Sequence, residues 1–98
     1  MATYQFLTQG TCARTIQFTI ENGALKDVAF EGGCNGNLQG ISRLVDGRSA
    51  EEVAGLVAGT QCGFKPTSCP DQLSRAIKGA LEMEAGKPSP LKTLVRVR

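Results

Sequence analysis

The chain has 98 residues, 41% of them hydrophobic and 20% charged, a composition typical of one soluble globular domain. Its formal net charge of +2 is too small to argue for nucleic acid binding, and no apolar run reaches the roughly 18 residues that a membrane span needs. The start of the chain lacks the basic and apolar regions of a secretory signal, so we expect a cytoplasmic location where thiols stay reduced.

The first third of the chain predicts an antiparallel sheet. Apolar and polar residues alternate over residues 4–6 and 16–21, which is the period of a half-buried strand. Asn22-Gly23 predicts a tight hairpin because both residues tolerate positive φ. A returning strand over residues 26–31 would place Val28 and Phe30 on the core face. The pattern therefore predicts a three-stranded meander.

The next part of the chain predicts three helices. The first follows the glycine-rich stretch 32–36 and ends at Asp46-Gly47, and the second opens on a capping box at residues 49–52 and stops at Gly59. The third follows a loop over residues 60–66. The predicted inward residues are Leu38, Ile41, Leu44, Val45, Val53, Leu56, Val57, Leu73, Ala76, Ile77, Ala80 and Leu81. The expected fold is α+β, a three-stranded antiparallel meander followed by three helices packed on one face.

The C-terminal part is expected to lie outside this domain. Residues 1–86 are predicted as one domain, and residues 87–98 as a linker and a basic tail. Lys92, Arg96 and Arg98 make the tail basic, which is more typical of a solvated terminus than of a nucleic acid patch. An extra edge strand over residues 93–98 is the alternative.

Four cysteines are the candidate functional residues: Cys12, Cys34, Cys62 and Cys69. A cysteine kept for packing usually lies inside a strand or on the apolar face of a helix, whereas each of these lies beside a glycine, a turn or a helix start. Cys69 lies in Thr67-Ser68-Cys69-Pro70-Asp71, where the Ser-x-x-Asp spacing and the proline predict the start of a helix. Free amides and the helix dipole at such a position favour a thiolate.

If the sheet ends and helix starts meet at one edge, four thiolates would suit a tetrahedral zinc ion or an iron–sulfur cluster. The chain has no His, which excludes imidazole ligands and a His-assisted thiol. The spacing contains no C-x2-C pair, so the interpretation depends on placement rather than on a linear motif. Thiol redox chemistry, disulfides and inert packing remain alternatives to metal binding.

Two weaker candidates are also present. The stretch Gly32–Asn37 precedes a helix and could bind an anion through its amides, but no Lys-Ser/Thr follows as in a P-loop. A turn with a helix cap is the favoured interpretation, so no fingerprint supports nucleotide binding. Asp71 is predicted as a first-turn residue that forms a modest surface pair with Arg75, rather than as a catalytic acid.

Thr67-Ser68-Cys69-Pro70-Asp71 is the signature string of the TSCPD domain, and the chain resembles this family from about Gly10 through Gly33–Ile41 and Cys62-Gly63 to Leu81. The family occurs as small stand-alone proteins and as the C-terminal domain of adenosylcobalamin-dependent (class II) ribonucleotide reductases. The resemblance implies an accessory module for a larger enzyme such as a ribonucleotide reductase, in DNA precursor synthesis. A name taken from the family would suggest ribonucleoside-diphosphate reductase. However, 98 residues cannot form the reductase barrel, so we expect no such activity from this chain alone.

The order of elements is also similar to that of the iron–sulfur cluster assembly scaffold proteins. Cys12, Cys34 and Cys69 match their order of cysteines, while Cys62 has no counterpart. Ala13 follows Cys12 where the scaffolds have Asp, and the scaffolds' His near the last cysteine is absent. The leading prediction is a metal-binding module with zinc or an iron–sulfur cluster. A thiol or cluster carrier and an interaction domain with packing cysteines are the alternatives; the metal, partner and oligomeric state stay open.

Overall fold

A computed structural model describes residues 2–8, 13–32, 35–60, 68–88, 91 and 93–97. The elements in chain order are β1 (Ala2–Leu7), β2 (Ala13–Glu21), β3 (Ala24–Gly32), α1 (Asn35–Val45), α2 (Ala50–Val57), α3 (Cys69–Glu84) and β4 (Leu94–Arg96). Within these residues no helix has the length and apolar character needed to cross a membrane. The predicted α+β fold class is confirmed.

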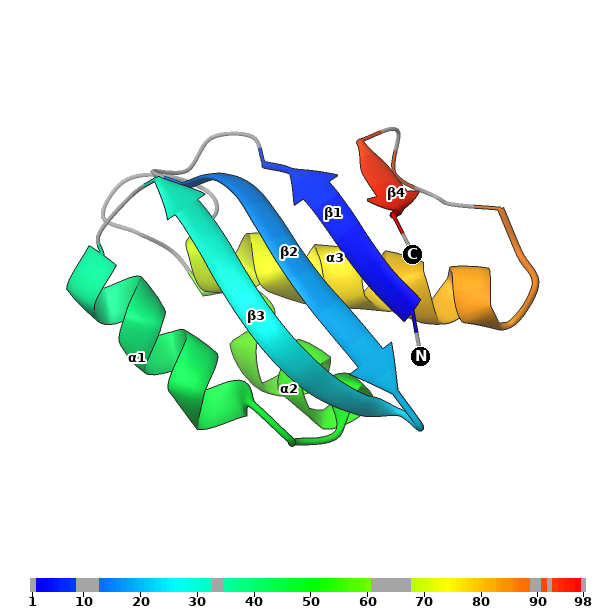
Figure 1. Cartoon of the computed structure of the whole chain (residues 1–98), viewed down its shortest axis with the longest axis horizontal. Coiled ribbons are helices and arrows are strands. Elements are labelled where there is room, and N and C mark those ends of the chain that lie inside the picture. The colour runs from blue at the N-terminus through cyan, green and yellow to red at the C-terminus, as the bar shows by residue number, and fades with distance from the viewer. Residues whose placement is uncertain are drawn as a thin grey trace.

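The sheet is antiparallel, with the strand order β3-β2-β1-β4 (Figure 1). The predicted meander forms its first three strands. Asn22 and Gly23 make the turn between β2 and β3 with φ angles of 51° and 79°. Both angles lie in the left-handed region, as the two central residues of a type I′ hairpin turn require. The local sequence therefore determines this hairpin.

The prediction of a C-terminal tail is wrong for Leu94–Arg96, which forms β4, so the edge-strand alternative is correct. The strand pairs with β1, placing Leu94 opposite Phe6 and Arg96 opposite Tyr4. Leu94 is only 2% exposed, because its side chain joins the main core. Burial of this leucine and pairing with the free edge of β1 hold the segment in the sheet.

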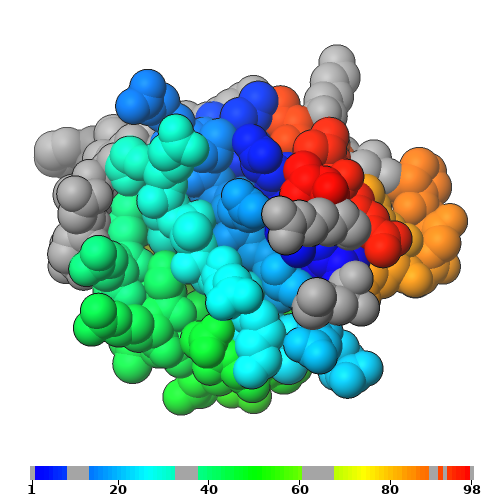
Figure 2. All heavy atoms as spheres, viewed as in Figure 1, coloured from blue at the N-terminus to red at the C-terminus, as the bar shows by residue number. Residues whose placement is uncertain are grey.

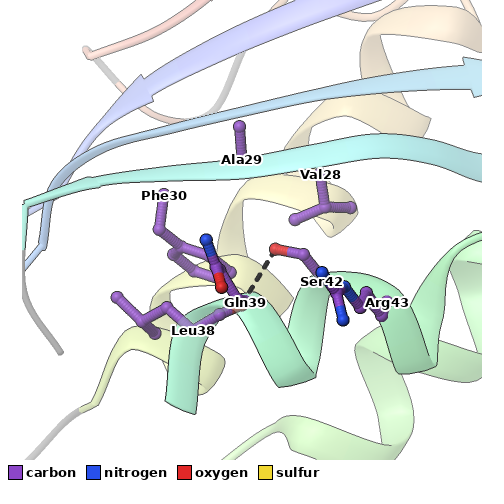
Figure 3. A pocket seen from close by; sticks show the side chains of 7 residues that line it. All are labelled: Val28, Ala29, Phe30, Leu38, Gln39, Ser42 and Arg43. Atoms are coloured by element: carbon purple, nitrogen blue, oxygen red, sulfur yellow. Dashed lines mark hydrogen bonds between the residues drawn. The ribbon is translucent and has the colours of Figure 1, made fainter. Parts of the chain in front are cut away.

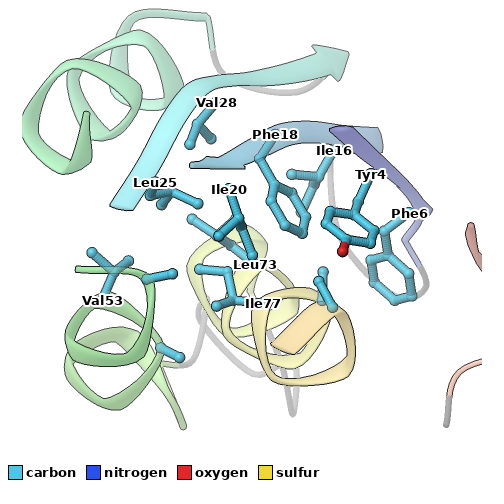
Figure 4. Packing of buried hydrophobic residues seen from close by; sticks show 14 of the residues in the cluster. Tyr4, Phe6, Ile16, Phe18, Ile20, Leu25, Val28, Val53, Leu73 and Ile77 are labelled. Carbon is cyan, nitrogen blue, oxygen red and sulfur yellow. The ribbon is translucent and has the colours of Figure 1, made fainter. Parts of the chain in front are cut away.

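The main core lies between the sheet and helices α2 and α3 (Figure 4). Side chains from all four strands point toward the two helices, and the rings of Tyr4 and Phe18 stack with their centroids 5.7 Å apart. Figure 2 shows the opposite face of the sheet, where the strands themselves form the surface. The largest fully buried apolar side chains are Tyr4, Phe18, Ile16, Ile20, Leu25, Leu73, Ile77 and Val53.

A bulge in β3 changes which side chains face the core. Gln17 pairs with Ala29 whereas Thr19 pairs with Lys26, so β3 carries an extra residue between these pairs. Asp27 lies there with a φ of 52°. Because of the bulge, Leu25 and Val28 are both buried although they are three positions apart. The Asp27 N–H donates to Asp46 Oδ1 at 3.1 Å, which holds the end of α1 beside the bulge.

Two predicted inward leucines are on the wrong side. Leu44 is 72% exposed and Leu56 is 67% exposed, while Val45 is buried as predicted and Ala54 is buried although it was not predicted to be. Neighbouring residues on a helix point about 100° apart, so a short apolar run does not decide which of them faces the core. The apolar stripe of α3 is as predicted: Leu73, Ala76, Ile77 and Ala80 are buried, and Leu81 packs against the core.

Candidate functional site

The structure describes one of the four candidate cysteines. Cys69 is the first residue of α3, has a free thiol and is 8% exposed. Its side chain forms a small apolar cluster with Leu38 of α1, and Phe30 and Ile41 pack against this pair. Cys12, Cys34 and Cys62 lie outside the described residues.

The neighbours of Cys12 and Cys34 lie together at one end of the sheet. Ala13, which follows Cys12, begins β2 and pairs with Gly32 at the end of β3. Cys34 is two residues beyond Gly32 and directly precedes α1. Leu38, in the first part of α1, packs with Cys69. The start of β2, the end of β3 and the start of α1 thus lie at one end of the fold, and Cys69 packs beside α1 (Figure 1).

A hydrogen bond brings the chain near Cys62 to Cys69. Ser68 Oγ donates to the carbonyl oxygen of Thr60 at 2.6 Å, and Ser68 directly precedes Cys69. Cys62 is two residues after Thr60 in the sequence. Described residues within two positions of each cysteine are therefore brought toward the same end of the fold.

The start of α3 is built as the sequence predicts. Ser68 is the N-cap, and its Oγ accepts the N–H of Asp71 at 3.2 Å. Pro70 occupies the first turn, where its missing N–H leaves no helical bond unmade. Cys69 therefore stands at the end of α3 where the helix dipole places positive partial charge.

Asp71 differs from the predicted surface residue. Oδ2 does pair with Arg75 at 3.2 Å, but Asp71 is only 5% exposed and its Oδ1 accepts the Gly59 N–H at 2.7 Å. Gly59 has a φ of 78° just after α2, as its predicted role in ending that helix requires. The link between Asp71 and Gly59 was not predicted, because periodicity and capping rules describe only contacts within one element.

A groove between β3 and α1 was also not predicted. A cavity of about 340 Å³ is lined by Val28, Ala29, Phe30, Leu38, Gln39, Ser42 and Arg43 (Figure 3). Ser42 Oγ donates to the Leu38 carbonyl at 2.9 Å, so its hydroxyl is hydrogen-bonded within α1. Phe30 and Leu38 belong both to this groove and to the cluster around Cys69. The groove therefore adjoins the cysteine end of the fold.

Among the residues that the structure describes, no three Cys, Asp, Glu or His side chains gather as metal ligands. Three of the four predicted ligands lie outside those residues, so metal binding stays a prediction.

A family model described as TSCPD domain matches residues 1–81. The matched part is most of the chain and contains all four cysteines together with the Ser68–Asp71 segment. Neither curated proteins nor solved structures gave a match to this chain. The likeness to the iron–sulfur scaffold proteins stays a prediction.

Proposed function

The chain belongs to the TSCPD domain family, and from this premise we propose that it is an accessory module that binds zinc or an iron–sulfur cluster. The proposed ligands are Cys12, Cys34, Cys62 and Cys69. The observation that supports this proposal is that described residues flanking all four cysteines approach one end of the fold.

The donor set fits such a group. Four thiols and no imidazole correspond to the all-cysteine ligand sets of structural zinc sites and of iron–sulfur clusters. A bound metal would connect the sheet, α1 and the start of α3, and a small core gains much of its stability from such a cross-link. The low exposure of Cys69 suits a ligand that stays in place better than a thiol that meets a partner.

The family also indicates a partner. TSCPD domains occur at the C-terminus of class II ribonucleotide reductases, so the proposed partner is a larger enzyme of this kind, and the proposed setting is DNA precursor synthesis in the cytoplasm. A chain of 98 residues cannot form the reductase barrel by itself, so the role proposed for the module is binding rather than the reductase reaction. The module would assist this partner enzyme as a separate chain.

One observation favours a second candidate function. Cys69 is clustered with Leu38, and Phe30 and Ile41 pack against this pair, which is the apolar setting that an inert cysteine has. An interaction domain whose cysteines serve only for packing would show this contact as well. In that case the protein binds no metal, and its thiols react slowly because they are buried.

Elemental analysis and thiol counting on reduced, anaerobically purified protein test the proposal. We expect about one zinc ion or one cluster per chain, thiols protected until the metal is removed, and a lower melting temperature with chelator. Cys69→Ser should lose the metal, whereas Ser42→Ala, which alters a hydroxyl in α1, should retain it. Metal-free protein with chelator-independent melting would support the packing function. Brown protein with labile iron would support the cluster-carrier alternative.

A further inference from the structure

Strand β3 lies at the edge of the sheet, and the first part of its outer side is already hydrogen-bonded. The Leu25 N–H donates to the Arg48 carbonyl at 2.7 Å, and the Gly47 N–H donates to the Leu25 carbonyl at 2.6 Å. Beyond the bulge at Asp27, no main-chain hydrogen bond joins residues 28–31 to a described segment other than β2. Within the described part of the chain, the second half of β3 therefore has an open edge.

The main-chain groups of Phe30 point toward this open edge. Successive residues of an antiparallel strand turn their N–H and carbonyl groups to opposite sides, so residues four apart turn them to the same side. Ile20 and Ile16 of β2 are four apart and lie opposite Leu25 and Phe30. Because Leu25 turns its main-chain groups outward, Phe30 does so as well. Strand β3 thus offers a donor and an acceptor to one more strand.

The open edge is also one wall of the groove between β3 and α1. The side chains of Val28 and Phe30 point toward α1, whereas the side chain of Ala29 points away from it (Figure 3). Ala29 nevertheless lines the groove, so the main chain of β3 forms part of the wall. An occupant of the groove can therefore reach the edge of the strand and the apolar side chains at the same time.

The charges along the groove differ from one end to the other. A second cavity of about 330 Å³ continues the first, and the two share the lining residues Val28, Ser42 and Arg43. The second cavity also reaches Asp27 and Asp46. Among the described residues that line the first cavity, Arg43 is the only charged one, and it forms no ion pair with a described residue. An occupant can thus place an acidic group beside Arg43 and a basic group beside the two carboxylates.

We propose that this groove binds an extended segment of a partner protein, which joins the sheet as a new edge strand beside β3. The main chain of the segment pairs with Phe30, one of its apolar side chains lies over Phe30 and Leu38, and an acidic residue faces Arg43. A basic residue farther along faces Asp27 and Asp46. In this mode of recognition the main-chain hydrogen bonds provide affinity and the side chains provide specificity. None of these groups is a cysteine, so the inference does not depend on the proposed metal site.

Selection from a phage-displayed library of random linear dodecapeptides on the purified full chain tests this inference. We expect enriched peptides in which apolar residues alternate with polar ones and which carry an acidic and a basic residue. An enriched peptide should shift the amide NMR signals of residues 28–31 and 38–43 and slow hydrogen exchange of the Phe30 N–H.

Three results of this selection would overturn the inference. They are a library that yields no binder, enriched peptides without an acidic residue, and a peptide that shifts the signals of β4 instead of those of β3. Signals of residues 28–31 that move with protein concentration in the absence of peptide would assign the edge to a second copy of the chain, which also overturns it.

Charge reversal at Arg43 tests the predicted chemistry of the segment. Arg43→Glu should weaken binding of an enriched peptide at least about tenfold, and the same peptide with lysine in place of its acidic residue should bind this variant better than it binds wild type. Arg14→Glu makes the same charge change at an exposed position of β2 and should bind the enriched peptide as wild type does. Equal affinity of wild type and Arg43→Glu would overturn the inference.

Ser42→Phe tests the groove itself, independently of charge. Ser42 lines both cavities and donates its hydrogen bond only within α1, so a phenyl ring there should fill the groove without removing a contact between elements. Both peptides should then fail to bind. Far-UV circular dichroism checks the fold of each variant, and unchanged peptide affinity in folded Ser42→Phe would overturn the inference. Metal content is measured separately, so failure of the groove leaves the proposed function standing.

Discussion

The phenol of Tyr4 donates a hydrogen bond to Glu84 Oε2 at 3.1 Å, joining the first strand to the last residue of α3. Burial, this hydrogen bond and the charge of Glu84 together raise the pKa of Tyr4 to about 12, against an opposing effect of Arg96. Strand β1 is thereby tied to α3 by a group that stays neutral well above the pH at which tyrosine normally ionises.

This pKa predicts a loss of stability in alkali. The unfolded chain releases the Tyr4 proton near pH 10, whereas the folded chain keeps it until about pH 12. The contribution of Tyr4 is therefore complete below pH 10 and is lost as the pH rises toward 12, in total on the order of 2 kcal/mol. Urea unfolding across this range should show a steeper decline for wild type than for Tyr4→Phe. Parallel declines would contradict the prediction.

Ser74→Ala should destabilise the fold by about 1 kcal/mol. Its buried hydroxyl donates to the Ala54 carbonyl of α2 at 2.6 Å, and the alanine variant loses this link between the two helices. Ser42→Ala is the matched control, because Ser42 bonds only to Leu38 within its own helix and should change stability by less than about 0.5 kcal/mol. Chemical denaturation of both variants measures the difference, and equal effects would argue against the proposed role of Ser74.

Leucines on opposite sides of the helices should differ sharply in their contribution to stability. Leu73→Ala removes a fully buried side chain and should lower the free energy of unfolding by about 2–5 kcal/mol. Leu44→Ala and Leu56→Ala remove exposed side chains and should change it by less than about 0.5 kcal/mol. A large loss of unfolding free energy in the Leu44 or Leu56 variant, measured on the same denaturant curves, would mean that this leucine makes stabilising packing contacts in solution.

Leu94→Ala tests whether β4 belongs to the folded unit. Leu94 is buried beside β1, so its truncation should lower the free energy of unfolding by about 2–4 kcal/mol. Val95→Ala, one residue further and exposed, should cost less than about 1 kcal/mol. If Leu94→Ala unfolds at the same denaturant concentration as wild type, β4 does not contribute to the fold in solution.

The sequence predicted those parts of the fold that are decided by neighbouring residues. The Asn22-Gly23 turn, the Ser49 and Ser68 caps and the end of α2 at Gly59 all depend on a few adjacent positions. Ser49 Oγ accepts the Glu52 N–H at 3.3 Å, as half of the predicted capping box requires. These features were therefore readable without any knowledge of the tertiary structure.

The features that were missed depend on partners far away in the chain. Leu94–Arg96 became a strand only because β1 offers a free edge more than 80 residues earlier. The bulge at Asp27 moved Leu25 into the core, and strict alternation cannot anticipate a bulge. For the candidate site, the helix start at Cys69 was predicted and confirmed, but the contact of Asp71 with Gly59 was not. Cys12, Cys34 and Cys62 lie outside the described residues, so their role stays a prediction.

The position of β4 has a practical consequence for recombinant work. The family match stops at residue 81, and a chain cut there would lack the strand that pairs with β1. The main-chain N–H and C=O groups of β1 on that side would then be open to pairing with other molecules, the usual beginning of edge-to-edge aggregation. The expressed chain should therefore extend through Val97. The Val97 N–H donates to the Thr3 carbonyl at 2.8 Å, so it adds a further main-chain hydrogen bond along this edge of β1.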